Sequence, residues 1–512
     1  MTDTSQNNKR IAKNTLLLYI RMLFTMLITL YTSRIILKAL GVEDFGIYNV
    51  VAGIVTFIGF INGTMITSTS RFITYELGKG NYQKLNLIFN IAFQIHFIIA
   101  IAIVIIAETI GLWFVYTHLN IPYEKLSDAV YIYQFSILSL FFNILTVPHS
   151  SLIVAHEKMS VYAYITVIDV IMKLLIAWLL MLLDNNRLIY YGLLLMLSQI
   201  IQNIIYHIYC TKNYVESKIR KCYNSSIFKE MLTFAGWSVF TSISTILYTQ
   251  GLNILLNLFF GPIINASRGI AVQVQGAVSR FCVSVQTAFN PQITKSYASN
   301  DLEYTRELIV NSSRFSVYLL LFLSISLFTE THFIIDLWLS ETPIYVCEFV
   351  QIMLAITIVE SMCNPMGTAI LATGKIRRYQ TSVGILLILI VPISYIFLKL
   401  KFLPDIIFKV HLIIMILTLL IRLFLVKKFI NMPYKYYFSK CILMIIKPTI
   451  LTILIISIYY HILHLPSFVN IIFVHSITFT IICIFGLKPN EKLLLINKIK
   501  SFIHNDKTKI NC

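Results

Sequence analysis

Charged residues are scarce in this sequence. Only 12% of its 512 residues are Asp, Glu, Lys or Arg, whereas 57% are hydrophobic and the mean hydropathy is +0.78. A water-soluble globular domain needs about 25% charged residues to cover its surface. The composition therefore excludes a water-soluble globule and indicates a membrane protein.

Several patterns that metal sites, redox enzymes and nucleotide-driven pumps require are also missing. None of the eight cysteines forms a CxxC pair, so neither a zinc site nor a redox motif is expected. The segment GTAILATGK lacks the glycine spacing of a phosphate-binding P-loop, and its Gly-Lys is followed by Ile376 instead of Ser or Thr. We therefore expect no metal, no cofactor and no nucleotide-driven pump.

Apolar runs of roughly 20 residues recur along the chain, and as helices each is long enough to cross a hydrocarbon core of about 30 Å. Their continuous apolarity favours helices over the alternating strands of a β-barrel. The first run is too long for the apolar region of a signal peptide and no small-residue cleavage site follows it, so no cleavable signal is expected. We predict about fourteen spans, at residues 15–37, 46–69, 87–112, 128–147, 160–183, 188–210, 230–259, 264–288, 311–335, 345–370, 380–399, 405–426, 440–461 and 467–487.

Positive charge is distributed unevenly between the two sides of the membrane. When the loops are assigned alternately, the side that carries Lys9, Arg10 and Lys13 collects 26 of the 41 Lys and Arg residues, the other side collects 4, and 11 lie within the spans. This is the positive-inside pattern, and it predicts that both termini are cytoplasmic and that the number of spans is even. It also accounts for the net charge of +18 without a nucleic-acid partner.

Matching positions recur in the same order in the two halves of the sequence, at offsets of 217 to 222 residues. The matches pair Gly41 with Gly261, Tyr75 with Tyr297, Glu108 with Glu330, and PHSSLIVAHEK at 148–158 with PMGTAILATGK at 365–375. Several matches in order indicate an internal duplication. Since each copy contains six spans, both copies start on the same side of the membrane, and the repeat is parallel.

The duplication predicts an all-α membrane protein in a 6+6+2 arrangement, with two parallel six-helix lobes around a central cleft. The predicted parts are an N-terminal lobe at 12–212, a basic cytoplasmic linker at 213–227, a C-terminal lobe at 228–430, two additional transmembrane helices at 431–488 and a basic cytoplasmic tail at 489–512. Two such lobes suit an alternating-access transporter, in which the substrate binds between repeats that rock against each other.

Five segments resemble the Wzx-type polysaccharide flippases of the MOP superfamily: TSRIILKALGVEDFGIYNVVAGIV, AETIGLWFVYTHLNIP, VPHSSLIVAHEKMS, YTQGLNILLNLFFGPIINASRGIAVQVQ and NPQITKSYA. The resemblance implies a bacterial inner-membrane protein that moves an undecaprenyl-diphosphate-linked oligosaccharide from the inner to the outer leaflet, for lipopolysaccharide O-antigen or capsule biosynthesis. We expect a monomer whose partners are this lipid-linked oligosaccharide, membrane lipids and other polysaccharide-assembly membrane proteins.

The first span carries a polar stripe. At 100° per residue, Asn14, Arg21, Thr25 and Thr32 lie within about 20° of one direction, whereas Arg34 points to the opposite side. Because charge inside a membrane usually faces a partner or a wet cavity, the stripe is predicted to line the cleft, with Arg21 binding the anionic diphosphate. The alternative is that its polar side chains only link helices.

A second stripe is predicted in the span 264–288, where Gln275 and Gln286 lie within about 40° of Arg268. These residues are further candidates for contact with the diphosphate or the glycan in the cleft. A role in linking helices, with Arg268 near the outer membrane interface, is an equally good interpretation of the same pattern.

Two carboxylates inside the spans are candidates for coupling transport to an ion. Glu360 lies well inside its span, and Pro365 follows it. An isolated carboxyl at membrane depth can load a proton, although Glu360 can instead form an ion pair with Arg280. Asp169 is spaced four residues from Lys173, which favours a neutralising ion pair over an ion site.

Two other functions share some of these features. A cation-coupled exporter of drugs or other small molecules, from the same superfamily, would have the same two lobes but a cleft dominated by carboxylates and aromatic rings. An integral-membrane glycosyltransferase or polymerase would need a catalytic acidic residue in a sizeable outward loop, and no predicted outward loop exceeds roughly 20 residues. We therefore do not expect an enzyme.

Overall fold

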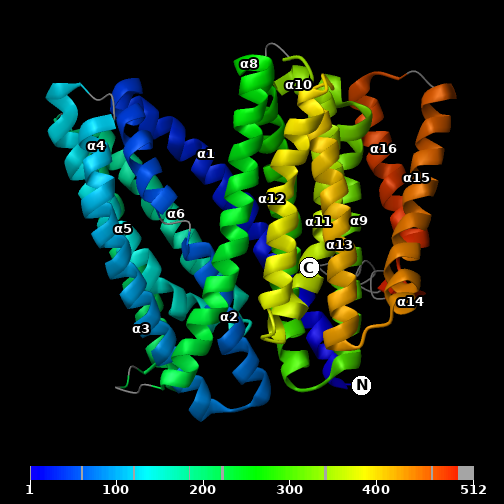
Figure 1. Cartoon of the computed structure of the whole chain (residues 1–512), viewed down its shortest axis with the longest axis horizontal. Helices are drawn as coiled ribbons and strands as arrows, with labels where there is room; N and C mark the ends of the chain where they lie inside the picture. Colours follow the sequence, from blue (N-terminus) through cyan, green and yellow to red (C-terminus); the bar gives the residue numbers. More distant parts are fainter. Residues whose placement is uncertain are drawn as a thin grey trace, which may run out of the picture. The chain divides into compact units, whose positions relative to one another are not determined.

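In the computed structural model, residues 2–58, 61–118, 122–183, 185–218, 220, 224–338, 343–462, 465–489 and 491–493 are described, and all regular elements within these ranges are helices (Figure 1). The all-α prediction is confirmed for this part of the chain. Residues 219 and 221–223 of the predicted linker, and the predicted tail from residue 494 onward, lie outside the described residues.

The helices are, in chain order, α1 Thr2–Ile58, α2 Ile61–Lys79, α3 Tyr82–Ile106, α4 Leu112–His118, α5 Tyr123–Ala155, α6 Met159–Met181, α7 Arg187–Asn213, α8 Ser225–Ala298, α9 Leu302–Thr329, α10 Thr331–Trp338, α11 Val346–Ala372, α12 Arg377–Lys399, α13 Ile406–Ile430, α14 Tyr434–Tyr437, α15 Leu443–Ile462 and α16 Ser467–Ile481. Wider π-helical turns at Ala107–Gly111, Phe438–Ile442 and Ile482–Gly486 join or extend some of them, and a 3-10 turn covers Val215–Ser217.

Among the described residues, 12 helical segments are long and apolar enough to cross a membrane, so the chain is a multi-pass membrane protein. The predicted spans 46–69 and 264–288 are not among the 12, and the expected number of about fourteen is not confirmed. The first is divided between α1 and α2, with residues 59 and 60 outside the described part. The second contains Arg268 and Arg280 as well as several glutamines, which make it less apolar.

Two of the helices bend sharply at a glycine. α1 kinks at Gly41, with φ 78° and ψ 173°, and α8 kinks at Gly261, with φ 79° and ψ −173°. Only glycine adopts this backbone conformation without a steric cost. Since the two glycines are one of the matched pairs in the sequence, the same bend occurs at the same place in both predicted repeats, which supports the duplication.

The chain divides into two compact units, whose boundaries differ from those of the predicted lobes. Unit 1 comprises Met1–Ile246, Thr287–Thr305 and Thr368–Ile385, and unit 2 comprises Leu247–Gln286, Arg306–Gly367 and Leu386–Cys512. Unit 1 therefore includes parts of the second predicted repeat: both ends of α8, the start of α9, the end of α11 and the start of α12. The division into lobes at 12–212 and 228–430 stays a prediction.

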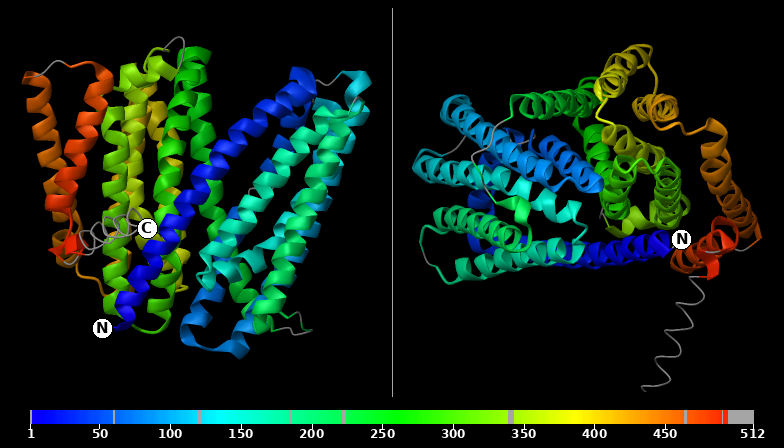
Figure 2. Two further views of the ribbon diagram at one scale, coloured as in Figure 1. Left: turned by 180° about the vertical axis from the view of Figure 1, so that it is seen from behind. Right: turned by 90° about the horizontal axis from the view of Figure 1, so that it is seen from below.

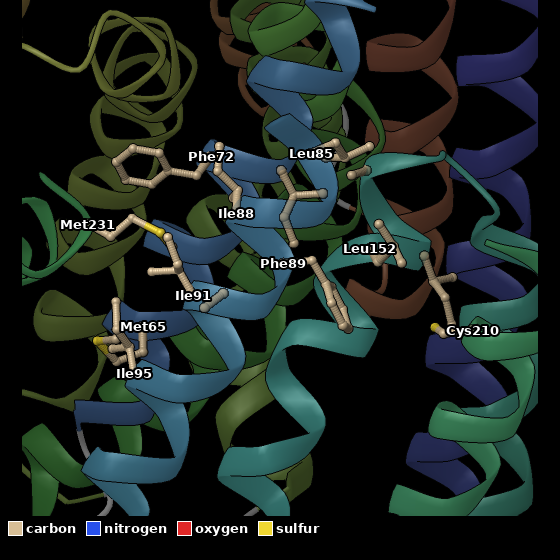
Figure 3. Close-up of a cluster of buried hydrophobic side chains, with 14 of the residues drawn as sticks. Met65, Phe72, Leu85, Ile88, Phe89, Ile91, Ile95, Leu152, Cys210 and Met231 are labelled. Carbon is tan, nitrogen blue, oxygen red and sulfur yellow. The ribbon is translucent and has the colours of Figure 1, made fainter. Parts of the chain in front are cut away.

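Unit 1 is built around long helices that pack lengthwise. α1 lies along α6, and α5 packs on α7 (Figure 2). At one end of the unit, a cluster of buried apolar side chains joins α2 and α3 to α7 and to the first turns of α8 (Figure 3). It includes Met65, Phe72, Leu85, Ile88, Phe89, Ile91, Ile95, Leu152, Cys210 and Met231. Residues of both predicted repeats thus share one hydrophobic core.

In unit 2, the last two long helices, α15 and α16, lie side by side (Figure 1) and are attached to α9 by hydrogen bonds. The hydroxyl of Tyr318 on α9 lies 2.6 Å from the carbonyl oxygen of Met444 and 3.0 Å from that of Gly486. Directly after α9, the Glu330 carboxylate accepts hydrogen bonds from Tyr460 on α15, at 2.6 Å, and Asn470 on α16, at 2.8 Å. α15 and α16 are therefore held to α9 at two levels.

We predict that Tyr318→Phe destabilises unit 2 by about 1–3 kcal/mol, because it leaves two carbonyl groups without their donor. The melting temperature of the detergent-solubilised protein should fall. Tyr164→Phe is the control, since Tyr164 is exposed on α6 and its hydroxyl has no described hydrogen bond. Equal melting temperatures for Tyr318→Phe and the unmodified protein would exclude this attachment.

Candidate functional site

The polar stripe of α1 lies in unit 1, and its members have different environments. Asn14 is buried, and its side-chain amide donates to the carbonyl oxygen of Glu157 at 3.3 Å. The Thr25 hydroxyl donates to Met22 of its own helix at 3.0 Å. Asn14 and Thr25 therefore already have hydrogen-bond partners within the protein.

Arg21 differs from Asn14 and Thr25, whereas the buried Thr32 hydroxyl also has no described partner. Arg21 is half-buried, and its guanidinium carbon lies 5.1 Å from the centre of the Tyr162 ring on α6. Its Nε is buried and has no hydrogen-bond partner among the described residues. An arginine held against an aromatic face keeps its in-plane N–H groups available for a planar or tetrahedral anion. Arg21 is therefore suited to bind a phosphate.

The residues of the α8 stripe lie in unit 2. Arg268 is buried; its guanidinium donates to the Thr249 carbonyl oxygen at 3.0 Å and also contacts the side chain of Asn253. These partners lie on the other arm of α8, so Arg268 braces the kink at Gly261. Gln275 is half-buried on the same helix.

Gln286 is buried and joins three helices. Its amide nitrogen donates to Ser316 on α9 at 3.2 Å and to the carbonyl oxygen of Ser361 on α11 at 2.9 Å. Its amide oxygen accepts a hydrogen bond from Asn364 at 3.2 Å. These contacts use its donors and its acceptor, which favours the helix-linking interpretation for Gln286.

The two carboxylates predicted for ion coupling lie in different units. In unit 2, Glu360 is half-buried on α11, and the nearby positive charge that acts on it is Arg422 of α13, not Arg280, which is exposed. In unit 1, Asp169 forms an ion pair of 2.8 Å with Lys173. The i,i+4 spacing therefore gives the expected ion pair, and Asp169 is the weaker candidate for an ion site.

Unit 1 also contains a cavity of about 330 Å³ that the sequence did not reveal. Its polar lining is neutral and consists of hydroxyl and amide side chains: Tyr48, Ser136, Ser139, Asn143 and Gln199. They come from α1, α5 and α7, and none of the predicted site residues contributes. In the part of the chain that the structure describes, no three His, Cys, Asp or Glu side chains are placed to hold a metal ion.

A charged cluster around Glu157 was also missed. Glu157 is buried in the turn between α5 and α6, where it meets Arg10, Gln292 and Lys295. Of the predicted site residues, only Asn14 contacts it. The repeat alignment, which matches Glu157 with Gly374, was the signal in the sequence that could have singled out this turn.

Comparisons with known proteins agree on the fold and on one family. Residues 11–297, more than half of the chain, match the family described as polysaccharide biosynthesis protein. An outward-facing multidrug resistance MATE family transporter of the MOP superfamily aligns with a TM-score of 0.72 and 13% identity, over 83% of this chain and 96% of that one. A MOP superfamily transporter from Pyrococcus furiosus, described as having a binding pocket of reversed polarity, aligns with a TM-score of 0.69 and 14% identity, over 83% and 96%.

No curated protein sequence matches the chain. At identities this low, the similarity to the solved structures establishes the fold alone. The family match carries the classification, and it agrees with the Wzx-like segments of the sequence. The chain belongs to the polysaccharide biosynthesis protein family, is Wzx-like, and has the MATE-like fold of the MOP superfamily.

Proposed function

We propose that this protein is an alternating-access flippase that moves an undecaprenyl-diphosphate-linked oligosaccharide from the inner to the outer leaflet of the bacterial inner membrane. The product would serve lipopolysaccharide O-antigen or capsule biosynthesis. The observation that carries the proposal is the match of residues 11–297 to the polysaccharide biosynthesis protein family. A helical fold with 12 candidate membrane spans suits transport. The proposed activity moves the substrate across the membrane without a catalytic step.

The proposed topology follows from the distribution of Lys and Arg. Both termini lie in the cytoplasm, the two six-helix lobes are 12–212 and 228–430, and two further helices complete the 6+6+2 arrangement. The turns at 80–81, 156–158 and 299–301 then lie at the cytoplasmic end. The lipid-linked substrate reaches the cleft from this side.

Two observations favour this substrate over a cationic drug. Arg21 lies six residues beyond Thr15, or about 9 Å inside the cytoplasmic end of the first span, where the diphosphate of a lipid from the inner leaflet first meets the cleft. The cavity in unit 1 offers neutral hydroxyl and amide groups, which match the hydroxyl groups of a sugar. A multidrug exporter of the same fold remains the alternative function, and its cleft would present carboxylates.

Glu360 is the proposed site at which transport is coupled to a cation gradient. It is half-buried on α11, and its carboxylate forms no described ion pair, although Arg422 acts on it electrostatically. A carboxyl group in this position can alternate between a protonated and an ionised form as the surrounding water and charges change.

We predict that Arg21→Ala lowers glycan export at least tenfold in a glycan-export mutant, because a charge-assisted contact with phosphate is worth about 1.5–3 kcal/mol. Arg21→Lys should retain part of the activity, since it keeps the charge and loses the planar fork. Arg34→Ala is the matched control, as Arg34 is exposed on the opposite side of the same helix.

The amount of each variant in the membrane is measured by immunoblot. Normal export by Arg21→Ala would remove Arg21 from the substrate site. Loss of the protein itself in both Arg21 variants would indicate a role in folding instead.

A second prediction concerns Glu360→Gln, which keeps the shape of the side chain and abolishes its titration. Export, or uptake of a labelled lipid-linked glycan into proteoliposomes, should lose its dependence on the imposed pH gradient. Glu348→Gln is the control, because Glu348 is exposed on the same helix. Unchanged pH dependence in Glu360→Gln would assign the residue to structure.

A third prediction separates the two glutamines of α8. Gln286→Ala should lower the free energy of unfolding by about 1–3 kcal/mol, because Ser361 and Asn364 lose their hydrogen-bond partner. The melting temperature should fall accordingly. Gln275→Ala should leave the melting temperature unchanged and reduce export. Full export by Gln275→Ala would show that this stripe does not contact the substrate.

A further inference from the structure

Four side chains converge on Glu157 in unit 1. The Glu157 side chain is only 1% exposed. Its carboxylate lies 2.8 Å from Arg10 Nε and 2.6 Å from Lys295 Nζ, and accepts a hydrogen bond of 2.6 Å from the side-chain amide of Gln292. Its main-chain carbonyl accepts from Asn14 at 3.3 Å. Two cations and one amide therefore hold one buried carboxylate.

These contacts join the two predicted repeats. Arg10 lies on α1, the helix that continues into the first repeat, and Glu157 lies between α5 and α6 of that repeat. Gln292 and Lys295 lie near the end of α8, in the second repeat. Burial lowers the pKa of Lys295, and the Glu157 carboxylate opposes that shift. The ion pair between Glu157 and Lys295 thus bridges the repeats where little water reaches it.

A second contact joins the repeats at the same end of unit 1. Arg71 on α2 is buried and donates to the carbonyl oxygens of Leu371, at 3.1 Å, and Ala372, at 2.9 Å, which are the last carbonyls of α11. A cation at a helix C-terminus is favourable because the carbonyls there lack partners within the helix. Gly374, with φ 76°, leaves room for this arginine, since a Cβ would lie 2.8 Å from Arg71 Nη2.

The two contacts lie at turns that are equivalent under the predicted repeat. Glu157 and Gly374 are 217 residues apart, and both have left-handed backbone conformations, with φ 59° and 76°. Tyr75 and Tyr297, another matched pair, touch each other with their ring centres 6.5 Å apart. Equivalent residues can touch only close to the axis that relates them. The pseudo-twofold axis therefore passes through this end of unit 1.

The chemistry of the two contacts nevertheless differs. Arg71 binds neutral carbonyl groups, whereas the Glu157 contact depends on a negative charge. Breaking a buried ion pair is costly chiefly when a charge is left without a partner. If the repeats separate, Lys295 and Gln292 leave with the second repeat, but Arg10 stays with Glu157 on the first. The carboxylate therefore keeps one cation in either arrangement.

We propose that Glu157 and Lys295 form a latch that closes the cytoplasmic end of the molecule, and that Arg10 makes this latch reversible by keeping Glu157 neutralised when it opens. This inference rests on the proposed function, because a latch between repeats matters only if the repeats move apart during transport. The proposal gives opposite roles to the two cations that contact the Glu157 carboxylate: Lys295 favours the closed state and Arg10 favours the open state.

The latch is tested by a distance across the repeats in the full-length protein in lipid nanodiscs. Genetically encoded spin labels at Lys212 and Glu303, which are exposed and belong to the first and second repeat, leave the eight native cysteines in place. Pulsed EPR then gives the ratio of molecules with a long distance between the two labels to molecules with a short one. The incubation temperature before freezing is chosen so that the unmodified protein populates both distances.

Glu157→Gln should raise this ratio about tenfold, as expected for a lost charge-assisted hydrogen bond of about 1.4 kcal/mol. Arg10→Gln should lower the ratio below that of the unmodified protein, because the open state would leave Glu157 without a cation. Adding Lys295→Gln to Glu157→Gln should change little, since both remove the same interaction.

Glu76→Gln is the matched control. Glu76 is 4% exposed and pairs with Lys84 at 2.8 Å, but both residues belong to the first repeat, so the ratio should stay unchanged. An unchanged ratio in Glu157→Gln, or opening by Arg10→Gln as large as that by Glu157→Gln, would overturn the latch. The distances require no glycan, so this outcome is independent of whether the protein transports the proposed substrate.

Discussion

A charge without a partner in a medium of low dielectric constant costs several kcal/mol, and this cost determines where the charged side chains of the chain lie. Arg314 is fully buried and is paired with Glu491, which follows α16. Asp169 is neutralised by Lys173 one helical turn away. Because each pair ties particular helices or helical turns together, the need to neutralise charge also fixes contacts that apolar side chains alone would leave free to slide.

The same constraint identifies the side chains that can act on a substrate. The terminal nitrogens of Arg268 bond to Thr249 and Asn253 of the same helix, and Gln286 uses its amide to join three helices. The Nε of both Arg268 and Arg21 has no described partner, but Arg21 is half-buried, rests on an aromatic ring and has no described hydrogen bond from its terminal nitrogens either. A cation kept in this state is stabilised further by any anion that reaches it, which is the property that a phosphate site needs.

The sequence predicted those features that depend on local pattern. Apolar runs predicted the helices, the i,i+4 spacing predicted the pair between Asp169 and Lys173, and the matched glycines, Gly41 and Gly261, anticipated two identical kinks. The cluster at Glu157 could not be found this way, because its partners are more than 130 residues away in the chain. A polar stripe was also ambiguous, since a side chain that links helices and one that lines a cavity follow the same helical period.

The predicted duplication pairs two turns whose central residues both have left-handed backbone conformations, and the structure shows a physical reason why their side chains differ. At Gly374 a Cβ would lie 2.8 Å from Arg71 Nη2, so a side chain there would displace the guanidinium, which in this copy donates to main-chain carbonyls. At the equivalent turn, Glu157 has the left-handed conformation that glycine would adopt more easily, with φ 59°. In that conformation the carboxylate lies between Arg10 and Lys295. The Arg71 contact therefore needs no acidic side chain, whereas the Glu157 contact does. A change that neutralises Glu157 alters the second contact and leaves the first in place.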